Sequence, residues 1–293
     1  MTEPIDRDLL IASAPLARAW AAESCWDGGN SGEGCQAYHA IWQYLRLIGV
    51  VTTLDFHAHL YTEALQRIAA DPTRRRVLLS GSADYGLLAI VAAAFRQAGA
   101  EPAVTLVDRC ETPLKLARWY GEKRRLTVET HQADLLTYDS ADRFDTVCVH
   151  SLLGLVHAAD RPLLTRRWHG LLRPGGRVLC INAISPAHHP AQVRYSAERR
   201  AEHRRRVEEA AQVCRDSLDI APETLGEMAF TYSGTVVSNV IRSRAEITAL
   251  FEDAGLVIEE QRFGRLGVDD SHHFSGPTPP EKREYAWIIA RRP

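Results

Sequence analysis

A regular alternation of apolar runs and helix-like segments between residues 76 and 182 limits the fold more than any other feature of this sequence. The runs VLLS, VTLVD, RLTVET, FDTVCVH and RVLCIN have the length of strands, and apolar residues recur at helical spacing between them. The run FDTVCVH is nearly all apolar, which is typical of a strand buried on both faces. Strands that alternate with helices so regularly predict an α/β fold with a doubly wound, mostly parallel, Rossmann-like sheet.

Helical sequence precedes this alternation and interrupts it near the end. Residues 1–71 are predicted to form a helical N-terminal cap, and residues 72–293 the α/β domain. A charged helical segment at about 186–242 is predicted to be an inserted lid, because its Arg and Glu residues have helical neighbour spacing. The apolar faces of the cap are Tyr38, Ile41, Trp42, Leu45 and Ile48 in one stretch, and Phe56, Leu60 and Ile68 in the next.

The alternation resumes after the insertion. Ser243 and Glu246 form a capping box, and Gly255 is placed to end the helix that follows it. Two further strand-like runs, LVIEEQRF and EYAWIIARRP, complete the pattern. The last of them is expected to finish the sheet.

The balance of charges disfavours several classes of partner. Lys and Arg number 35 against 37 Asp and Glu, which gives a net charge of −2. This balance favours neither nucleic acid nor a membrane as partner, and no apolar run reaches the ~18 residues of a membrane span. Acids at positions 3, 6 and 8 are atypical of a signal peptide. We therefore expect a cytoplasmic protein with no nucleic-acid or membrane partner.

Six cysteines are scattered along the chain, and none is spaced as CxxC. This spacing gives only weak support to a zinc or redox site, so no metal is predicted. Cys148 and Cys180 lie within apolar runs, where a buried free thiol is common. Cys25 and Cys35 flank the glycine-rich WDGGNSGEG and could pair as an alternative, although a reducing compartment favours free thiols.

The turn SGSADYG after the first apolar run is the first candidate binding element. Glycines let a backbone approach a nucleotide closely, and the turn holds only Gly81 and Gly86. This stretch also approximates the dinucleotide fingerprint with one alanine, and Asp108 lies where the ribose of a nucleoside cofactor would need a carboxylate. The turn and its acid therefore leave the kind of cofactor open.

Several features together resemble the class I S-adenosylmethionine-dependent methyltransferases. They are VLLSGSADYG, VTLVD ending in Asp108, ADLLTY with Asp134, LLRPGGRVLCIN, and the closing ALFEDAGLVIEEQRF and YAWIIARRP. The piece LLRPGGRVL is the most specific of them. The resemblance implies a seven-stranded sheet of order 3-2-1-4-5-7-6 with the last strand antiparallel. It also implies S-adenosylmethionine, rather than NAD, across the carboxyl ends of the first strands.

The resemblance assigns the first turn to the methionine part of the cofactor. Leu79 stands where the family has an acid, and Asp84 is expected to substitute for it. Ala83 fits if its φ is negative, and Tyr85 should turn aside while the helix starts at Gly86. The residues assigned to this turn are Ser80, Gly81, Ser82, Ala83 and Asp84.

The next strand ends carry the expected contacts to the nucleoside. Asp108 is assigned to the ribose hydroxyls, and Arg109 follows it as a neighbour of the cofactor. Asp134 is assigned to the adenine amino group, and Leu135 to the face of the adenine. His150, at the end of the fourth strand, is placed beside both cofactor and acceptor.

Acceptor-side residues are predicted on the fourth strand and in the cap. His150 is the candidate general base because its side chain titrates nearest neutrality, and Ser151 faces the acceptor. His57 and Tyr61 lie one helical turn apart and are further catalytic candidates. The aromatic candidates for the acceptor site are Trp26, Tyr38, His39 and Trp42.

The leading function is methyl transfer from S-adenosylmethionine to a small-molecule acceptor, for instance a natural product, by in-line displacement. A helical cap and an insertion suit a small acceptor better than DNA or protein. Two alternatives stay open: a methyltransferase fold that catalyses cyclisation, elimination or decarboxylation of a biosynthetic intermediate, and a non-catalytic partner subunit. A homodimer is also left open.

Overall fold

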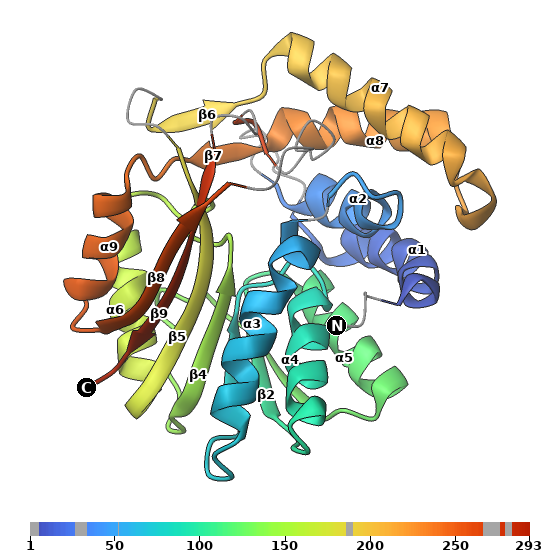
Figure 1. Cartoon of the computed structure of the whole chain (residues 1–293). Coiled ribbons are helices and arrows are strands. Elements are labelled where there is room, and N and C mark those ends of the chain that lie inside the picture. Colours follow the sequence, from blue (N-terminus) through green and yellow to red (C-terminus); the bar gives the residue numbers. More distant parts are fainter. Residues whose placement is uncertain (1–5, 27–33, 52, 186–189, 266–275, 279–282) are drawn as a thin grey trace.

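A seven-stranded sheet forms the centre of the protein (Figure 1). The computed structural model describes residues 6–26, 34–51, 53–185, 190–265, 276–278 and 283–293. The strand order is β3-β2-β1-β4-β5-β9-β8, in which β9 runs antiparallel to both neighbours and the first five strands pair in parallel. The predicted order 3-2-1-4-5-7-6 is therefore confirmed. The strands are β1 (Arg76–Ser80), β2 (Ala103–Asp108), β3 (Val128–Gln132), β4 (Phe144–His150), β5 (Leu172–Ile184), β8 (Val257–Gly264) and β9 (Glu284–Arg291).

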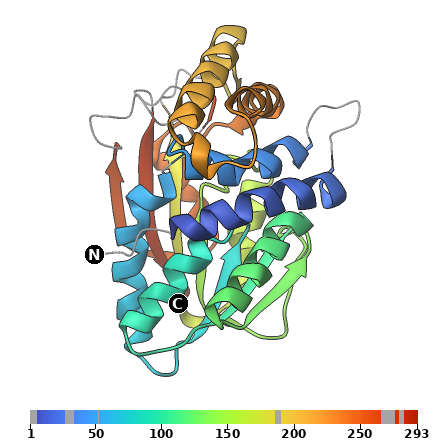
Figure 2. The same cartoon turned by 90° about the vertical axis from the view of Figure 1, so that its right-hand side faces the viewer.

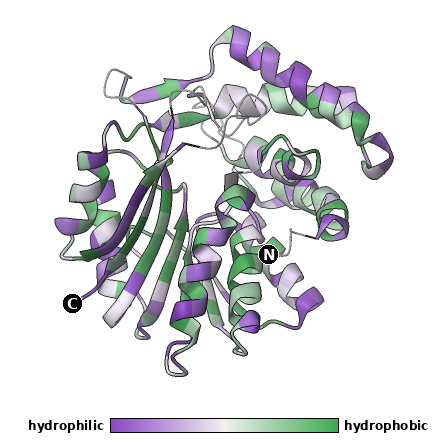
Figure 3. Ribbon diagram, in the orientation of Figure 1, coloured by the Kyte–Doolittle hydropathy of each residue, from purple (hydrophilic) through white to green (hydrophobic). Residues whose placement is uncertain are grey.

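Helices cover both faces of the sheet. Because side chains alternate along a strand, Val77 and Leu79 of β1 pack on one face and Leu78 on the other, and all three are fully buried. The central strands are accordingly apolar along their length (Figure 3). One face is covered by α3 (Thr53–Ala69), α4 (Gly86–Gln97) and α5 (Glu111–Arg124), and the other by α6 (Arg161–Leu171) and α9 (Arg244–Glu252).

A second group of helices lies beyond the carboxyl ends of the parallel strands (Figures 1 and 2). The insertion and the first part of the chain meet there in one apolar cluster, which includes Ile41, Leu45, Val207, Leu225 and Tyr232. A two-stranded sheet, which the sequence did not predict, pairs two segments near the ends of the insertion. These elements are α1 (Arg7–Ser24), α2 (Gln36–Leu47), β6 (Gln192–Arg194), α7 (Ala197–Val213), α8 (Pro222–Thr235) and β7 (Val237–Asn239), with a short 3₁₀ turn at Arg215–Ser217.

The predicted start and end of α9 are confirmed. The Ser243 hydroxyl accepts from the Glu246 N–H at 3.0 Å, and Glu246 in return accepts from the N–H of Arg242, one residue before the cap. Gly255 follows the helix with a φ of +81°, a conformation that glycine adopts without strain.

Two local expectations were wrong. Phe56 is 47% exposed, because the buried face of α3 is formed by Ala58, Tyr61, Leu65 and Ile68. The third strand was expected over 125–130 but begins at Val128, since Arg125 takes a left-handed conformation (φ 54°) that ends α5 and turns the chain.

Apolar packing crosses the expected domain boundary at residue 71. Tyr61, Leu65 and Ile68 of α3 share a core cluster with Val77 and Phe95 of the α/β domain. The division into 1–71 and 72–293 stays a prediction, as does the lid at 186–242, of which residues 186–189 lie outside the described part. None of the described helices is long and apolar enough to cross a membrane.

Candidate functional site

The turn after β1 brings its backbone close to neighbouring side chains. Gly81 has a φ of +72°, and a Cβ at this position would lie 3.1 Å from Leu152 Cδ1. The Gly81 N–H donates to the Val107 carbonyl at 2.9 Å, and Ser80 accepts from Trp168 Nε1 at 2.8 Å. Both the backbone conformation and the space therefore require glycine at 81. Ala83 is not among the described residues with positive φ, as expected.

A buried ion pair occupies the second half of the turn. Asp84 Oδ2 accepts from Arg46 Nη1 of α2 at 2.6 Å, and Asp84 Oδ1 accepts from the Gly86 N–H at 2.6 Å. Tyr85 turns into the core and stacks on Tyr120 with ring centroids 4.8 Å apart. The predictions that Tyr85 turns aside and that the helix starts at Gly86 are confirmed. Both Asp84 oxygens thus have protein partners. A contact between Asp84 and a cofactor stays a prediction.

Asp108 ends β2 with its carboxylate held by two backbone groups. Its Oδ2 accepts from the Ser82 N–H at 2.9 Å and its Oδ1 from the Cys110 N–H at 2.7 Å. A carboxylate has about four lone-pair positions, so two stay open for further donors. Burial raises the pKa of Asp108, and these two N–H groups oppose that rise.

Asp134 and its neighbours lie at the next strand end. Asp134 Oδ1 accepts from the Leu136 N–H at 2.9 Å, and its Oδ2 lies 3.9 Å from Arg109 Nε. The Asp134 side chain is 41% exposed and therefore accessible. Leu135 is buried. Its Cδ1 atom lies 3.7 Å from the position that a Cβ at Gly81 would take. The expected adenine-side residues thus gather beside the glycine turn.

The three catalytic candidates, His57, Tyr61 and His150, are brought together at the end of β4. The Tyr61 hydroxyl donates to the Val149 carbonyl at 2.5 Å and lies 3.3 Å from His150 Nδ1. The His57 and His150 rings are 5.9 Å apart. Burial, with smaller contributions from the charges of His57 and Arg46, lowers the pKa of His150 to about 3, and burial raises the pKa of Tyr61 well above its ordinary value.

This electrostatic setting disfavours one expected role. A general base works best with a pKa near the working pH, so a His150 pKa of about 3 makes it a poor base and a neutral hydrogen-bonding group instead. Ser151, at the same strand end, has a φ of 57°, and its N–H donates to the Ile181 carbonyl at 2.7 Å. Its contact with an acceptor stays a prediction.

Residues 86–176 match the family model described as "Methyltransferase domain". The chain contains a methyltransferase domain. The matched segment spans α4 to the first residues of β5, and the strand order of the whole sheet is the one implied for class I methyltransferases. The fold around the matched segment is thus the one that the resemblance to the S-adenosylmethionine-dependent class implies.

Solved structures and curated proteins were compared as well. The methyltransferase is similar to the N-methyltransferase NodS from Bradyrhizobium japonicum in complex with S-adenosyl-L-homocysteine, with 14% identity, 81% of this chain and 88% of that chain covered, and a TM-score of 0.47. It is also similar to a putative methyltransferase from Bacillus halodurans, with 19% identity, coverage of 79% and 98%, and a TM-score of 0.48. No curated protein matches the chain. The family assignment depends on the domain match and the strand order.

The residues of the site fit S-adenosylmethionine in one respect. Asp108 keeps lone pairs for the two hydroxyls of a ribose. The space next to the Gly81 backbone is taken by Leu152 and Leu135, so the turn alone gives no evidence for a ligand. One feature of the family is missing, because Leu79 is a fully buried apolar residue where an acid is expected.

The aromatic candidates separate into two groups. Tyr38 lies at the interface with the insertion, where its ring stacks on Tyr232 at 5.9 Å and contacts Trp42 at 4.9 Å. Trp26 is 58% exposed. His39 is buried and directs Nδ1 at the thiols of two cysteines. An acceptor contact stays a prediction for all four residues, although His39 has other partners.

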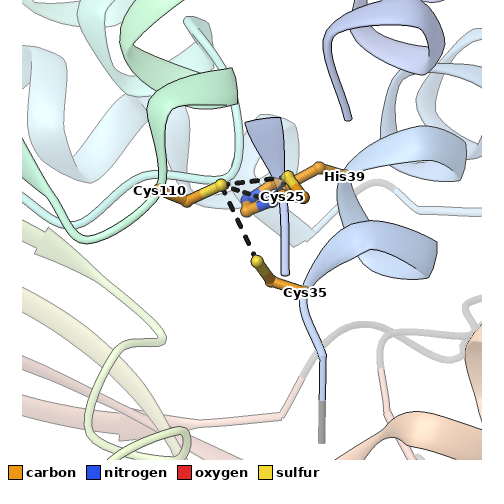
Figure 4. Close-up of side chains that lie close together, drawn as sticks. All are labelled: Cys25, Cys35, His39 and Cys110. Carbon is orange, nitrogen blue, oxygen red and sulfur yellow. Dashed lines mark hydrogen bonds between the residues drawn. The ribbon is translucent and has the colours of Figure 1, made fainter. Parts of the chain in front are cut away.

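Sequence reasoning missed one cluster in the methyltransferase. Cys25, Cys35, His39 and Cys110 converge beside the end of β2 (Figure 4). The available signal was the spacing of Cys35 and His39, which places them one turn apart on α2. The cysteines of this cluster are not spaced as CxxC, and Cys110 is far away in the sequence.

Proposed function

We propose that the methyltransferase transfers the methyl group of S-adenosylmethionine to a small-molecule acceptor, of which natural products are one class. The observation that carries this proposal is the helical cover over the carboxyl ends of the strands. There α2 meets α8 through the Tyr38–Tyr232 stack and the apolar cluster around Leu45 and Leu225. Because helices cover the carboxyl ends of the strands, an enclosed small acceptor is favoured over a polymer, which would need an open surface.

The charges of the insertion support the same acceptor class. On α7, Arg205 pairs with Glu202 at 2.7 Å and with Glu209 at 2.6 Å, and Arg204 pairs with Glu227 of α8 at 2.8 Å. These cations are neutralised within the insertion, so they offer little to a phosphate backbone, whose binding depends on basic side chains. We include in the proposal that neither nucleic acid nor a membrane is a partner. The six free cysteines fit the cytoplasm as location.

The proposal assigns the following roles to the chain's own residues. The cofactor supplies an electrophilic methyl group on a sulfonium centre. Asp108 accepts hydrogen bonds from the ribose hydroxyls, and Asp134 accepts one from the adenine amino group. Neutral His150, held beside the Tyr61 hydroxyl, orients the acceptor by a hydrogen bond. Such a transfer requires alignment of the nucleophile more than a strong base, which agrees with a His150 pKa of about 3.

A second candidate function is supported by Leu79. The family's acid is absent from this position, and the nearest acid of the turn, Asp84, is paired with Arg46. A weakened hold on the methionine part of the cofactor is compatible with a domain that performs cyclisation, elimination or decarboxylation. It is also compatible with a partner subunit that transfers no methyl group.

Calorimetric titration with S-adenosylmethionine and S-adenosylhomocysteine tests the cofactor site. We expect both to bind, and Asp108→Asn to weaken binding by about 30-fold, because a hydrogen bond to a charged group contributes roughly 2 kcal/mol. Asp216→Asn is the matched control, since the Asp216 side chain is fully exposed on the insertion. Equal binding by all three proteins would contradict the assignment of Asp108.

Methyl transfer itself requires a separate measurement. The wild-type protein is incubated with isotopically labelled S-adenosylmethionine and a panel of small phenols, amines and thiols, and labelled product is followed by mass spectrometry. We expect label in at least one acceptor together with release of S-adenosylhomocysteine. Tight cofactor binding with no labelled acceptor and no demethylated cofactor would favour the second candidate function.

A further inference from the structure

Three thiols and one imidazole meet in the cluster formed by Cys25, Cys35, His39 and Cys110. We propose that it binds one zinc ion as a closed Cys₃His site. Cys25 follows the end of α1, Cys35 is the residue before α2, His39 lies in the first turn of α2, and Cys110 precedes α5. Their ligand atoms all lie within 4.8 Å of one another, and Figure 4 shows the four side chains converging from three segments.

Three of the separations between the ligand atoms match a tetrahedral ion. Zn–S bonds of about 2.3 Å and Zn–N bonds of about 2.0 Å place two sulfurs about 3.8 Å apart and a sulfur and a nitrogen about 3.5 Å apart. Cys35 Sγ and Cys110 Sγ are 3.7 Å apart. His39 Nδ1 lies 3.4 Å from Cys25 Sγ and 3.3 Å from Cys110 Sγ. Cys25 Sγ and Cys110 Sγ are 3.0 Å apart and would have to separate by about 0.8 Å around an ion.

The donor set also selects the ion. Thiolates and imidazole are ligands for zinc, whereas calcium and magnesium prefer oxygen. Four protein ligands close the coordination sphere, which is the arrangement of a structural rather than a catalytic zinc. On binding, the three thiols lose their protons to solvent, and neutral His39 donates its Nδ1 lone pair, so the occupied site carries one net negative charge.

Neighbouring groups support the cluster as a ligand site. The Thr112 hydroxyl lies 3.0 Å from Cys25 Sγ, where it can donate to a thiolate. His39 and Cys110 are buried, and Cys25 and Cys35 are half-buried, so the ion would be shielded but reachable. Without an ion, the thiols have mainly one another and His39 as partners, and thiols form weak hydrogen bonds.

The position of the cluster gives the ion a role. The Cys110 N–H donates to Asp108, so the proposed zinc fixes the backbone that holds the cofactor-binding carboxylate. It would at the same time join α1 and α2 to the β2–α5 turn. The ion thus positions the N-terminal helices at the edge of the site and takes no part in the chemistry. The zinc site does not depend on the proposed acceptor or on methyl transfer.

Metal analysis of the full-length protein tests the site directly. The protein is produced in zinc-supplemented medium, purified under reducing conditions without a histidine tag, and analysed by plasma mass spectrometry. We expect about one zinc per chain. Cobalt, reconstituted after removal of zinc, should show the intense visible absorption of a tetrahedral thiolate complex.

Ligand variants distinguish this cluster from other cysteines. Cys35→Ser and His39→Ala should lose most of the zinc, and Cys214→Ser should keep it, since Cys214 is a half-buried thiol outside the cluster. If a variant fails to fold, mercurial titration of the wild-type thiols serves instead: zinc should be released as cluster thiols react, and chelator should expose three additional thiols to a disulfide reagent.

Three results would overturn the proposal. One is a wild-type protein with less than about a tenth of an equivalent of zinc both as isolated and after reconstitution. Another is unchanged zinc content in a folded Cys35→Ser variant. The third is a Cys25–Cys110 disulfide in the native protein, found by mass spectrometry after alkylation. S-adenosylmethionine binding is measured on the same samples, so failure of the zinc site and failure of the cofactor site are separate outcomes.

Discussion

Helix α2 is attached to two neighbouring strand ends by opposite kinds of chemistry. At β1, Arg46 pairs with Asp84 in a buried ion pair. At β2, Cys35 and His39 meet Cys110 in a cluster of thiols and imidazole. The first attachment is complete within the protein, because Asp84 has Arg46 and the Gly86 N–H as partners. The second consists of soft donors that become strong partners only around an ion, so it is the attachment that can respond to metal supply.

Removing the ion pair should have the largest effect. Arg46→Met leaves the Asp84 carboxylate buried without its cation, and we expect a loss of about 3–5 kcal/mol in the free energy of unfolding, measured with urea. The exposed pair of Arg205 is the matched control, and Arg205→Met should leave the free energy of unfolding almost unchanged, because water screens exposed ion pairs. An Arg46→Met protein as stable as the control would show that this attachment contributes little.

The double variant Arg46→Met/Asp84→Asn sharpens the same test. It removes both charges, so it should be more stable than the sum of its single variants predicts. Strict additivity of the two changes would indicate that Arg46 and Asp84 act separately, against the 2.6 Å contact between them.

Removing metal should have the next largest effect. If free zinc is about a hundred times its Kd, binding stabilises the folded protein by about 2.7 kcal/mol, which chelator removes. Thermal unfolding of the wild-type protein should therefore shift to lower temperature with chelator, while Cys35→Ser is unaffected. Equal shifts in both proteins would mean that the chelator acts elsewhere.

The glycine turn at β1 offers a smaller, matched pair of changes. Gly81 and Gly99 both have positive φ, +72° and +69°, but only Gly81 has side-chain atoms near a built Cβ. Gly99→Ala should cost about 1 kcal/mol from backbone strain alone, and Gly81→Ala about 2 kcal/mol because Leu152 must also move. Only Gly81→Ala should weaken cofactor binding, and calorimetry would reveal a parallel loss in Gly99→Ala as a contradiction.

The smallest effect concerns the end of β4, where His150 is a buried, neutral imidazole. The pKa of His150 falls from 6.5 to about 3 in the folded protein, so below pH 6.5 the unfolded chain binds the extra proton. Between about pH 6.5 and 5.5 the folded state should lose about 1 kcal/mol through this group, and further acid should continue the loss. His150→Gln should flatten this part of the urea-stability profile and leave the slope above pH 7 unchanged. An unaltered acid limb would contradict burial of the neutral form.

Local sequence signals were sufficient for most of the fold. Apolar runs of strand length and the capping box at Ser243 predicted the strands and the start of α9, because each depends on residues close together in the chain. The strand order followed from the resemblance to class I methyltransferases. The expected turn at RPGG lies inside β5. Phe56 was placed wrongly because the helical face was chosen from a few large side chains, whereas smaller Ala58 and Tyr61 one turn away define the buried side.

The candidate site was predicted less completely because its partners come from distant segments. The positions of Asp108 and the glycine turn followed from strand ends, but the pairing of Asp84 with Arg46 joins residues 38 apart. His39 and Cys110 are 71 residues apart, and no short motif includes both. A pattern search finds ligands that share one turn or helix, and this cluster is assembled from three segments.

The buried Arg46–Asp84 pair has a consequence for where the recognisable enzyme begins. The family match starts at residue 86, yet Asp84, whose carboxylate accepts from the first N–H of that helix, is paired with an arginine 38 positions upstream. A protein shortened to the sheet and its connecting helices would leave the Asp84 carboxylate buried without its cation. We therefore expect that residues 86–176 do not fold as an independent unit. A chimaera in which the N-terminal helices are exchanged must keep a cation at the position of Arg46.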